Sequence, residues 1–252
     1  MYINNINILI YVLVIFTGII SGQFLDWYKI RLEEHKKIFS KSEMSVYFHN
    51  MKINYKYIIL NILLNLVVLY FNGNSDIIVT IMYLLLVPML LAAFSIDYKL
   101  KIIPNRLNLT MFEIGLFFTF LEGIININVA VRMLLGMVAG AGIFMLITLI
   151  AGLIAGKEAM GLGDVKFMGA LGLYFGIEKI IAISVLSFLL ATIIAIPLLI
   201  FKKKSNADYM PFGPFIVLAC FITMIVPFDI IVFVLFKIFT LGSYRGSFIL
   251  KK

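Results

Sequence analysis

The sequence has few charged residues and almost no cysteine. Only 13% of its 252 residues are charged and 63% are hydrophobic, whereas about a quarter of the residues in a soluble domain are charged. The single cysteine, Cys220, lies in an apolar run, which excludes an intramolecular disulfide and a cysteine-based metal cluster. The two histidines, His35 and His49, are spaced as in no zinc motif. The composition therefore excludes an ordinary soluble domain, and these residues predict no metal site.

Long apolar runs predict an all-α, polytopic membrane protein that forms one membrane-embedded domain over 1–252. A helix needs about 20 apolar residues to cross a bilayer. We expect about eight membrane segments, near 6–25, 57–71, 77–96, 107–121, 129–155, 166–176, 179–201 and 212–236. Glycines spaced four residues apart, as in Gly136 and Gly140 or Gly172 and Gly176, predict close contacts between these helices.

The basic residues predict the orientation in the membrane. One side holds 15 of the 21 Lys and Arg residues, in the loops 26–56, 97–106, 156–166 and 202–210. The positive-inside rule places this side in the cytoplasm. We expect 26–56 to be a cytoplasmic polar loop, part of which could form a basic amphipathic helix. The basic residues are not interleaved with stacking aromatics, so they do not indicate binding to nucleic acid.

Two acids, Asp97 and Asp164, lie at the cytoplasmic ends of apolar segments and so at one membrane depth. Pro104 follows Asp97 and pre-sets the first turn of the next helix. Gly161 and Gly163 precede Asp164 and permit backbone shapes closed to other residues. The carboxylate of Asp164 can then cap the helix that begins there. A third rigid turn at this edge is formed by Pro211, Phe212, Gly213 and Pro214.

A pair of aspartates at this depth favours acid–base hydrolysis. One carboxylate would activate a water, and the other, protonated, would polarise an amide carbonyl. Two close carboxylates do not ionise together cheaply, so they share one proton. Because a helix N-terminus favours a carboxylate, we expect Asp164 to carry the charge and Asp97 the proton. In the alternative, each acid merely pairs with a neighbouring lysine, Lys99 or Lys166.

The chain resembles the type IV prepilin peptidases, the bacterial branch of the GxGD membrane aspartyl proteases. The resemblance covers most of 75–236 and rests on three blocks in order. These are Asp97 with Ile103–Pro104–Asn105 and Leu107, the stretch GKEAMGLGDVK at 156–166, and Pro211–Phe212–Gly213–Pro214. The stretch SGQFL at 21–25 is also similar to a pattern near the family's N terminus.

The resemblance implies an aspartic endopeptidase of the bacterial cytoplasmic membrane, with prepilins or pseudopilins and membrane lipids as its partners. It would remove the short basic leader on the cytoplasmic side, just before the pilin's hydrophobic helix. By motif position, Asp97 and Asp164 would be the catalytic pair. The other motif positions, which we expect to place the substrate, are Gly161, Gly163, Glu158, Lys166, Pro104, Asn105, Pro211, Phe212, Gly213 and Pro214. One hypothesis pairs Lys166 or Lys157 with the acidic residue that pilins carry early in their mature helix.

The chain departs from longer family members in its first cytoplasmic loop. Those proteins often have two Cys-x-x-Cys pairs that bind zinc, whereas 26–56 contains no cysteine, which excludes a zinc site of that kind. Many relatives also methylate the new N terminus with S-adenosylmethionine. This chain has no glycine-rich nucleotide loop, so methylation rests on the resemblance alone, and proteolysis itself requires no cofactor.

Two other functions stay open at this point. One is a transporter or channel that uses the acids at the membrane edge as an ion site. The shared depth of Asp97 and Asp164 and the lack of an inverted repeat argue against it. The other is an accessory assembly protein that has kept the fold without activity.

Overall fold

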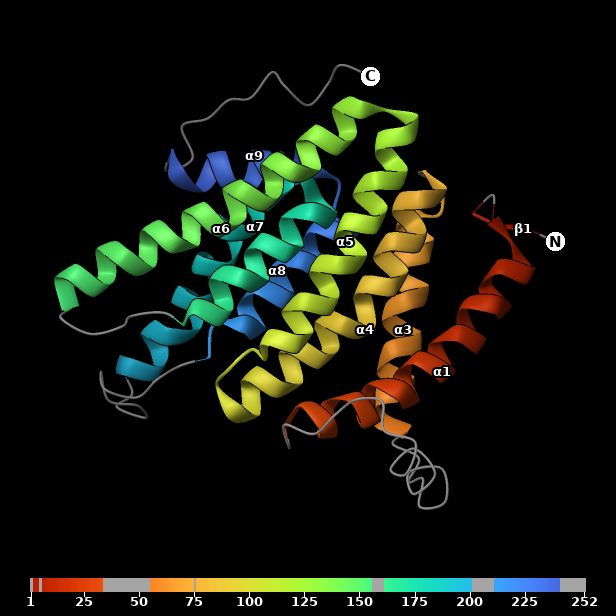
Figure 1. The fold of residues 1–252 in the computed structure, drawn as a ribbon, viewed down its shortest axis with the longest axis horizontal. Coiled ribbons are helices and arrows are strands. Elements are labelled where there is room, and N and C mark those ends of the chain that lie inside the picture. Colours follow the sequence, from red (N-terminus) through yellow and green to blue (C-terminus); the bar gives the residue numbers. More distant parts are fainter. Residues whose placement is uncertain are drawn as a thin grey trace.

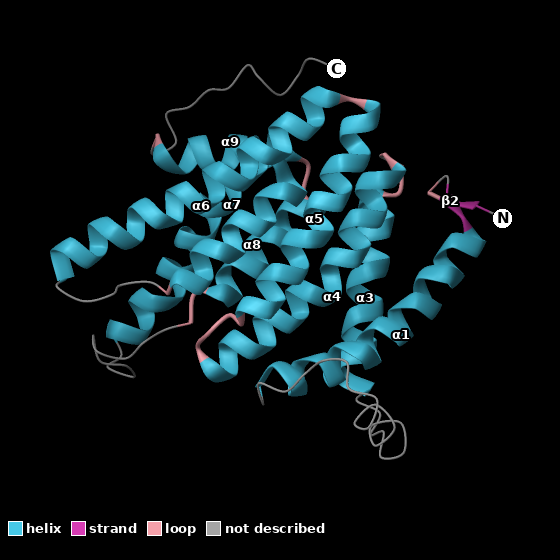
Figure 2. Ribbon diagram, viewed as in Figure 1, coloured by secondary structure: helices cyan, strands magenta, loops and turns pink. Residues whose placement is uncertain are grey.

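The described part of the chain is almost entirely helical (Figure 1, Figure 2). The computed structural model describes residues 2–4, 6–33, 55–74, 76–155, 161–200 and 211–240. The strands β1 (Tyr2–Ile3) and β2 (Ile6–Asn7) form a short antiparallel hairpin. The helices are α1 (Ile8–Glu33), α3 (Tyr55–Asn72), α4 (Ile77–Leu100), α5 (Asn105–Ile125), α6 (Ile127–Ala155), α7 (Leu162–Ile200), α8 (Gly213–Ile225) and α9 (Phe228–Phe239). The predicted all-α bundle is confirmed.

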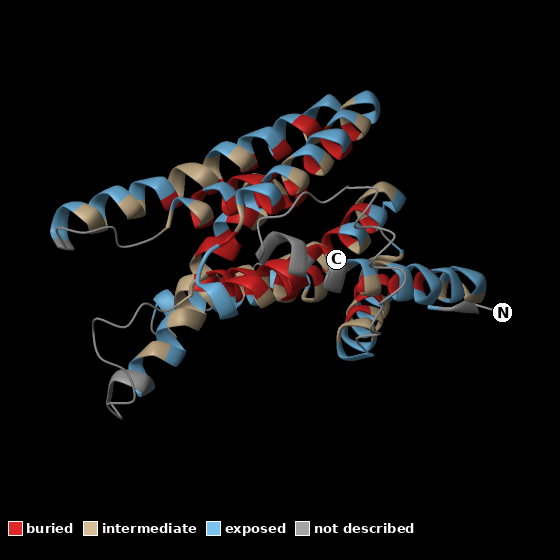
Figure 3. Ribbon diagram, turned by 60° about the horizontal axis from the view of Figure 1, so that its bottom comes forward, coloured by how far each residue is buried: buried red, intermediate tan, exposed pale blue. Residues whose placement is uncertain are grey.

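Apolar side chains fill the interior and also cover the outside of this bundle. The helices α3 to α7 are long and apolar enough to cross a membrane. Figure 3 shows buried residues gathered along the inner helices and exposed residues on the outer faces. The outward-facing side chains include Leu153 and Ile154, which are 87% and 83% exposed. A surface so rich in exposed apolar groups is suited to lipid rather than water, as a multi-pass membrane protein requires.

The helix α7 is a helical hairpin that turns at Gly176. The backbone of Gly176 is left-handed, with φ 69° and ψ 175°, which breaks the helix there. Met168, before the turn, and Ile180, after it, both lie against Gly140 of α6. The two halves therefore run side by side along α6, as expected for separate segments near 166–176 and 179–201. The first half, 162–175, rises only about 21 Å, less than the roughly 30 Å of a bilayer core.

Two of the expected boundaries are wrong. The segment predicted at 212–236 is two helices, because α8 ends at Ile225 and Pro227, which lacks an N–H, precedes α9. The predicted loop 26–56 begins as helix, because α1 runs on to Glu33. The rest of that loop, 34–54, lies outside the described residues.

Glycines allow α6 and α7 to approach each other closely. A Cβ atom on Gly172 would lie 2.2 Å from the carbonyl oxygen of Gly136, and one on Gly136 would lie 2.5 Å from that of Gly172. A Cβ on Gly140 would lie 2.4 Å from the carbonyl oxygen of Met168. Real Cβ atoms do not come this close to backbone, so the predicted packing role of these glycines is confirmed.

We predict that Gly172→Ala destabilises the protein, because the new methyl group must push the backbones of α6 and α7 apart. Overpacking of this kind costs roughly 1–3 kcal/mol. Thermal unfolding of the purified protein in detergent measures the effect as a lower midpoint. Gly142→Ala is the matched control, since a Cβ there has nothing within 4 Å. Equal midpoints for the two variants would contradict the proposed tight contact.

Candidate active site

Four helix ends meet around the two acids: the end of α4 and the starts of α5, α7 and α8. Asp97 lies in the last turn of α4 and is 2% exposed, whereas Asp164 is the third residue of α7 and is 4% exposed. The charge on Asp97 acts on Asp164, so the two carboxyl groups are within electrostatic reach of each other. Two acids that are 67 positions apart in the sequence are thus buried close to each other.

A tight turn separates Asp97 from α5. Lys101 adopts a left-handed backbone with φ 58°, and its N–H donates to the carbonyl oxygen of Asp97 at 2.8 Å, which ends α4. Pro104 then precedes the first residue of α5, and its carbonyl oxygen accepts the N–H of Leu107 at 3.1 Å. This geometry agrees with the role predicted for Pro104. It keeps Asp97 next to the start of α5.

The turn at 211–214 contacts Asp97 directly. The backbone N–H of Gly213 donates to Oδ2 of Asp97 at 2.8 Å. A Cβ on Gly213 would lie 2.7 Å from the same oxygen, so only glycine fits without displacing the acid. Pro214 follows in the first turn of α8, while Pro211 lies just before the helix. The sequence placed this turn at the correct edge but did not predict its bond to Asp97.

Phe212 anchors this turn in the core. Its ring lies 4.8 Å from the ring of Phe188 and 5.8 Å from that of Phe144, measured between centroids. Phe188 belongs to the second half of α7 and Phe144 to α6, so the start of α8 is held by two neighbouring helices. Aromatic pairs at these separations contribute beyond the area that they bury.

Gly163, just before Asp164, serves close packing rather than an unusual backbone. In the described chain, Gly176 is the only glycine with positive φ, so the expectation for Gly161 and Gly163 is wrong. A Cβ on Gly163 would instead lie 3.2 Å from the carbonyl oxygen of Ile103, which brings α7 against the α4–α5 turn. The carbonyl oxygen of Gly161 accepts the N–H of Asp164 at 3.0 Å, so Asp164 lies within the first turn.

The carboxyl group of Asp164 does not act as the predicted helix cap. It accepts no hydrogen bond from any residue in the described ranges. The proton assignment predicted from helix ends also loses its basis. Asp164 lies at the start of α7, but Asp97 is bonded to the start of α8. Both acids therefore lie beside a helix N-terminus, and the expected difference between them is absent.

Lys166 pairs with a neutral side chain of α5. Its ammonium donates to Oδ1 of Asn105 at 2.8 Å, and both side chains are exposed. This bond joins two of the predicted motif positions and speaks against a pairing of Lys166 with Asp164. Glu158 and Lys157, the remaining motif positions singled out, lie outside the described residues.

Asn108 belongs to the site, although none of the motif positions expected from the sequence included it. Its Nδ2 donates to the carbonyl oxygen of Gly163 at 3.0 Å, and the residue is 3% exposed. It therefore ties α5 to the backbone just before Asp164. An amide placed one turn into an apolar span, four residues after Pro104, was the available signal, because buried polar groups in membrane helices need partners.

This arrangement suits acid–base chemistry on a substrate bond that reaches the end of α4 and the start of α7, where the two acids lie. Two carboxyl groups within electrostatic reach can divide the work, since one can take a proton from water while the other gives one to a leaving group. The backbone N–H of Gly213 fixes the position of one of them.

Comparison with known proteins shows similarity to leader peptidases. Residues 84–196, which contain both acids, match the model of the type IV leader peptidase family. A prepilin leader peptidase/N-methyltransferase of Aeromonas hydrophila is 31% identical over 146 residues, 58% of this chain and 49% of the relative. Proteins of the same name from Neisseria gonorrhoeae and Escherichia coli K12 are 31% and 28% identical, over 54% and 51% of this chain and 45% and 56% of theirs.

The chain thus spans about half the length of the curated relatives that it matches. No solved structure matches it significantly. The matched region holds the first two of the three sequence blocks, from Asp97 to Lys166. The resemblance inferred from the sequence is confirmed, because residues 84–196 match the type IV leader peptidase family and the relatives carry that activity in their names.

Proposed function

We propose that this protein is a membrane aspartic endopeptidase that removes the leader peptide of a type IV prepilin or pseudopilin. One observation carries the proposal: Asp97 and Asp164, from two different helices, lie buried within electrostatic reach inside the region that matches a leader peptidase family. The relatives' names, which include prepilin leader peptidase, support this substrate class.

The proposed reaction uses both carboxyl groups. One, ionised, takes a proton from a water molecule, whose oxygen attacks the carbonyl carbon of the scissile amide. The other, protonated, donates a hydrogen bond to the carbonyl oxygen, and the amide nitrogen leaves as an amine after accepting a proton. Gly213 keeps the Asp97 carboxyl in place throughout through its N–H. Asn108 does the same for the backbone that carries Asp164.

The proposed site faces the cytoplasm at the bacterial cell membrane. In the topology predicted from the sequence, Asp97 and Asp164 adjoin the side that carries most of the Lys and Arg residues, which the positive-inside rule assigns to the cytoplasm. The first half of α7 is too short to span the bilayer core by itself, so Asp164 at its start can lie beneath the lipid surface. A peptide would reach it by leaving helical form near the membrane edge.

Two cavities lined by described residues do not suit S-adenosylmethionine near the acids. The cavity lined by Asn108 and Lys166 has no carboxylate in its lining to bind ribose hydroxyls, and Lys166 would repel the cationic sulfonium. A smaller cavity that contains Glu122 and Glu178 lies at the opposite ends of the helices, beside the Gly176 turn. We therefore propose proteolysis on the geometry of the acids, while methylation rests on the relatives' names, which include N-methyltransferase. Mass spectrometry of the processed N terminus reports cleavage and any added methyl group together.

Asp97→Asn and Asp164→Asn are each expected to lower kcat for prepilin cleavage by about 100-fold or more, the usual contribution of a general acid or base. Cleavage in proteoliposomes, followed as a shift of the pilin band, measures the effect. Asp229→Asn is the matched control, because Asp229 is exposed in the first turn of α9. A wild-type rate in either catalytic variant would contradict the assignment, and a transporter would leave prepilin uncut in every case.

Gly213→Ala should lower activity without comparable loss of stability. The new methyl group would lie 2.7 Å from Oδ2 of Asp97 and would displace that carboxyl from its N–H partner. Misplacement of a catalytic group by about 1 Å can cost on the order of 100-fold in rate. We expect a fall in kcat larger than the change in KM, with the thermal midpoint near that of Gly142→Ala. Full activity in Gly213→Ala would show that the contact has no catalytic importance.

A further inference from the structure

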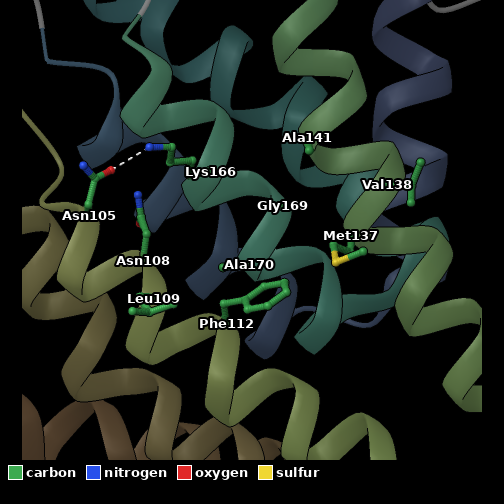
Figure 4. Close-up of a pocket in the computed structure, with 10 residues that line it drawn as sticks. All are labelled: Asn105, Asn108, Leu109, Phe112, Met137, Val138, Ala141, Lys166, Gly169 and Ala170. Atoms are coloured by element: carbon green, nitrogen blue, oxygen red, sulfur yellow. Dashed lines mark hydrogen bonds between the residues drawn. The ribbon is translucent and has the colours of Figure 1, made fainter.

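A cavity of about 700 Å³ lies between α5, α6 and α7. Figure 4 shows the residues that line it. On α5 it is lined by Asn105, Asn108, Leu109 and Phe112, whose spacing places them on one face of the helix. The other lining residues are Met137, Val138 and Ala141 of α6 and Lys166, Gly169 and Ala170 of α7. We refer to this cavity as the α5–α6–α7 groove.

The α5–α6–α7 groove is polar at one end and apolar at the other. Asn105, Asn108 and Lys166 lie at the starts of α5 and α7, on the same side as the acids. Further from that side the lining is Leu109, Phe112 and the α6 residues. An occupant must therefore be apolar along the membrane and polar at the membrane edge.

The polar end offers two unused bonding positions. Oδ1 of Asn108 has no hydrogen-bond partner in the described chain, while its Nδ2 is held by the carbonyl oxygen of Gly163. Lys166 uses one of its three N–H bonds on Asn105 within the described ranges. The occupant that satisfies both carries an N–H donor for Asn108 and an anionic group for Lys166.

The small residues of the groove favour a helix over a lipid chain. Ala141, Gly169 and Ala170 line the groove from two helices. Gly169 packs on Ala141, with a Cβ on Gly169 only 3.2 Å from that of Ala141, so no large side chain projects from this wall. Small side chains at a membrane-facing surface let the backbone of another helix come close, which is how helices associate in lipid. An acyl chain gains nothing from such closeness.

Two lining residues of the groove lie close to Asp164 along the chain or through a hydrogen bond. Asn108 holds the carbonyl of Gly163, next to Asp164, and Lys166 is two residues beyond that acid. We propose that the α5–α6–α7 groove binds the apolar membrane helix of the substrate, with an anionic side chain of that helix at Lys166 and a backbone N–H at Asn108. This inference rests on the proposed function, and it assigns the part of the substrate that follows the scissile bond.

Filling the groove tests the proposal. Ala141→Phe places a ring in the groove, whereas Gly142→Phe adds the same ring at the next residue of α6, where a Cβ has nothing within 4 Å. Two substrates are compared: a full prepilin in proteoliposomes and a soluble peptide that ends shortly after the scissile bond. In Ala141→Phe, kcat/KM for the prepilin relative to the peptide should fall roughly tenfold, the loss typical of a blocked anchor. In Gly142→Phe, the ratio should equal that of wild type.

An unchanged ratio in Ala141→Phe would overturn the groove proposal and leave the peptidase assignment standing. Wild-type protein that cuts neither substrate would overturn the peptidase assignment itself.

A photo-crosslinking residue in the groove gives a second test that does not depend on Ala141. Placed at Val138 in the Asp164→Asn background, it should capture prepilin, whereas at Leu146, which is 60% exposed, it should not. Capture of phospholipid alone at Val138 would show that the groove is a lipid site.

The charge at the groove's edge gives a second test. Lys166→Glu should raise KM for a prepilin that has an acid early in its apolar helix, by about tenfold. Replacing that acid with lysine in the substrate should restore cleavage by Lys166→Glu and impair cleavage by wild type. Absence of rescue in this exchange would remove the anionic contact from the proposal.

Discussion

The hydrogen bond from the Gly213 N–H to the Asp97 carboxyl joins the end of α4 to the start of α8, and the geometry of the site depends on it. Asp97 is almost completely buried, and a buried acid without partners is costly in a membrane protein. The start of α8 supplies a partner at a helix N-terminus, and the Phe212 ring fixes that start against α6 and α7. The turn at 211–214 thus holds in place the acid of the first sequence block, Asp97.

Close backbone contacts determine where the second acid lies. The glycine contacts between α6 and the first half of α7 set the position of that short helix in the bundle. Gly163 packs on the α4–α5 turn, and Asn108 bonds to its carbonyl oxygen, so the first turn of α7 is held from two sides. Asp164 therefore meets Asp97 because two helices that point in opposite directions both place an acid at the same edge. The α5–α6–α7 groove has Asn105, Asn108 and Lys166 at this edge and apolar residues further along the helices.

Much of this fold could be predicted from local chemistry. Apolar run lengths identified the helices, and the glycine spacings predicted the contacts of Gly136, Gly140 and Gly172. The turn at Gly176 agrees with the two separate segments expected there. The break at Pro227 was missed because the hydrophobicity on both sides of the proline is continuous, and hydrophobicity alone does not report a change of direction.

The candidate site could be predicted only in part, because local sequence patterns do not report how distant helices pack. Motif positions pointed to Asp97 and Asp164, but the contacts between motifs depend on how distant helices pack. The bond from Gly213 and the role of Asn108 are such contacts, and Gly163 serves close approach rather than a left-handed turn. The predicted placement of the charge on Asp164 and the proton on Asp97 lost its basis. Asp97 lies at the end of α4, but its carboxyl group is hydrogen-bonded to the N-terminus of α8.

The central claim is that Asp97 and Asp164 work as one unit, and a double-mutant cycle on prepilin cleavage tests it most directly. Single-turnover rates are measured for wild type, each asparagine variant and the variant with both changes. If the two acids form one catalytic unit, the double variant should lose about as much rate as either single variant. Losses that multiply would mean that the two carboxyl groups act independently, which would contradict a mechanism in which they divide the proton transfers of one reaction.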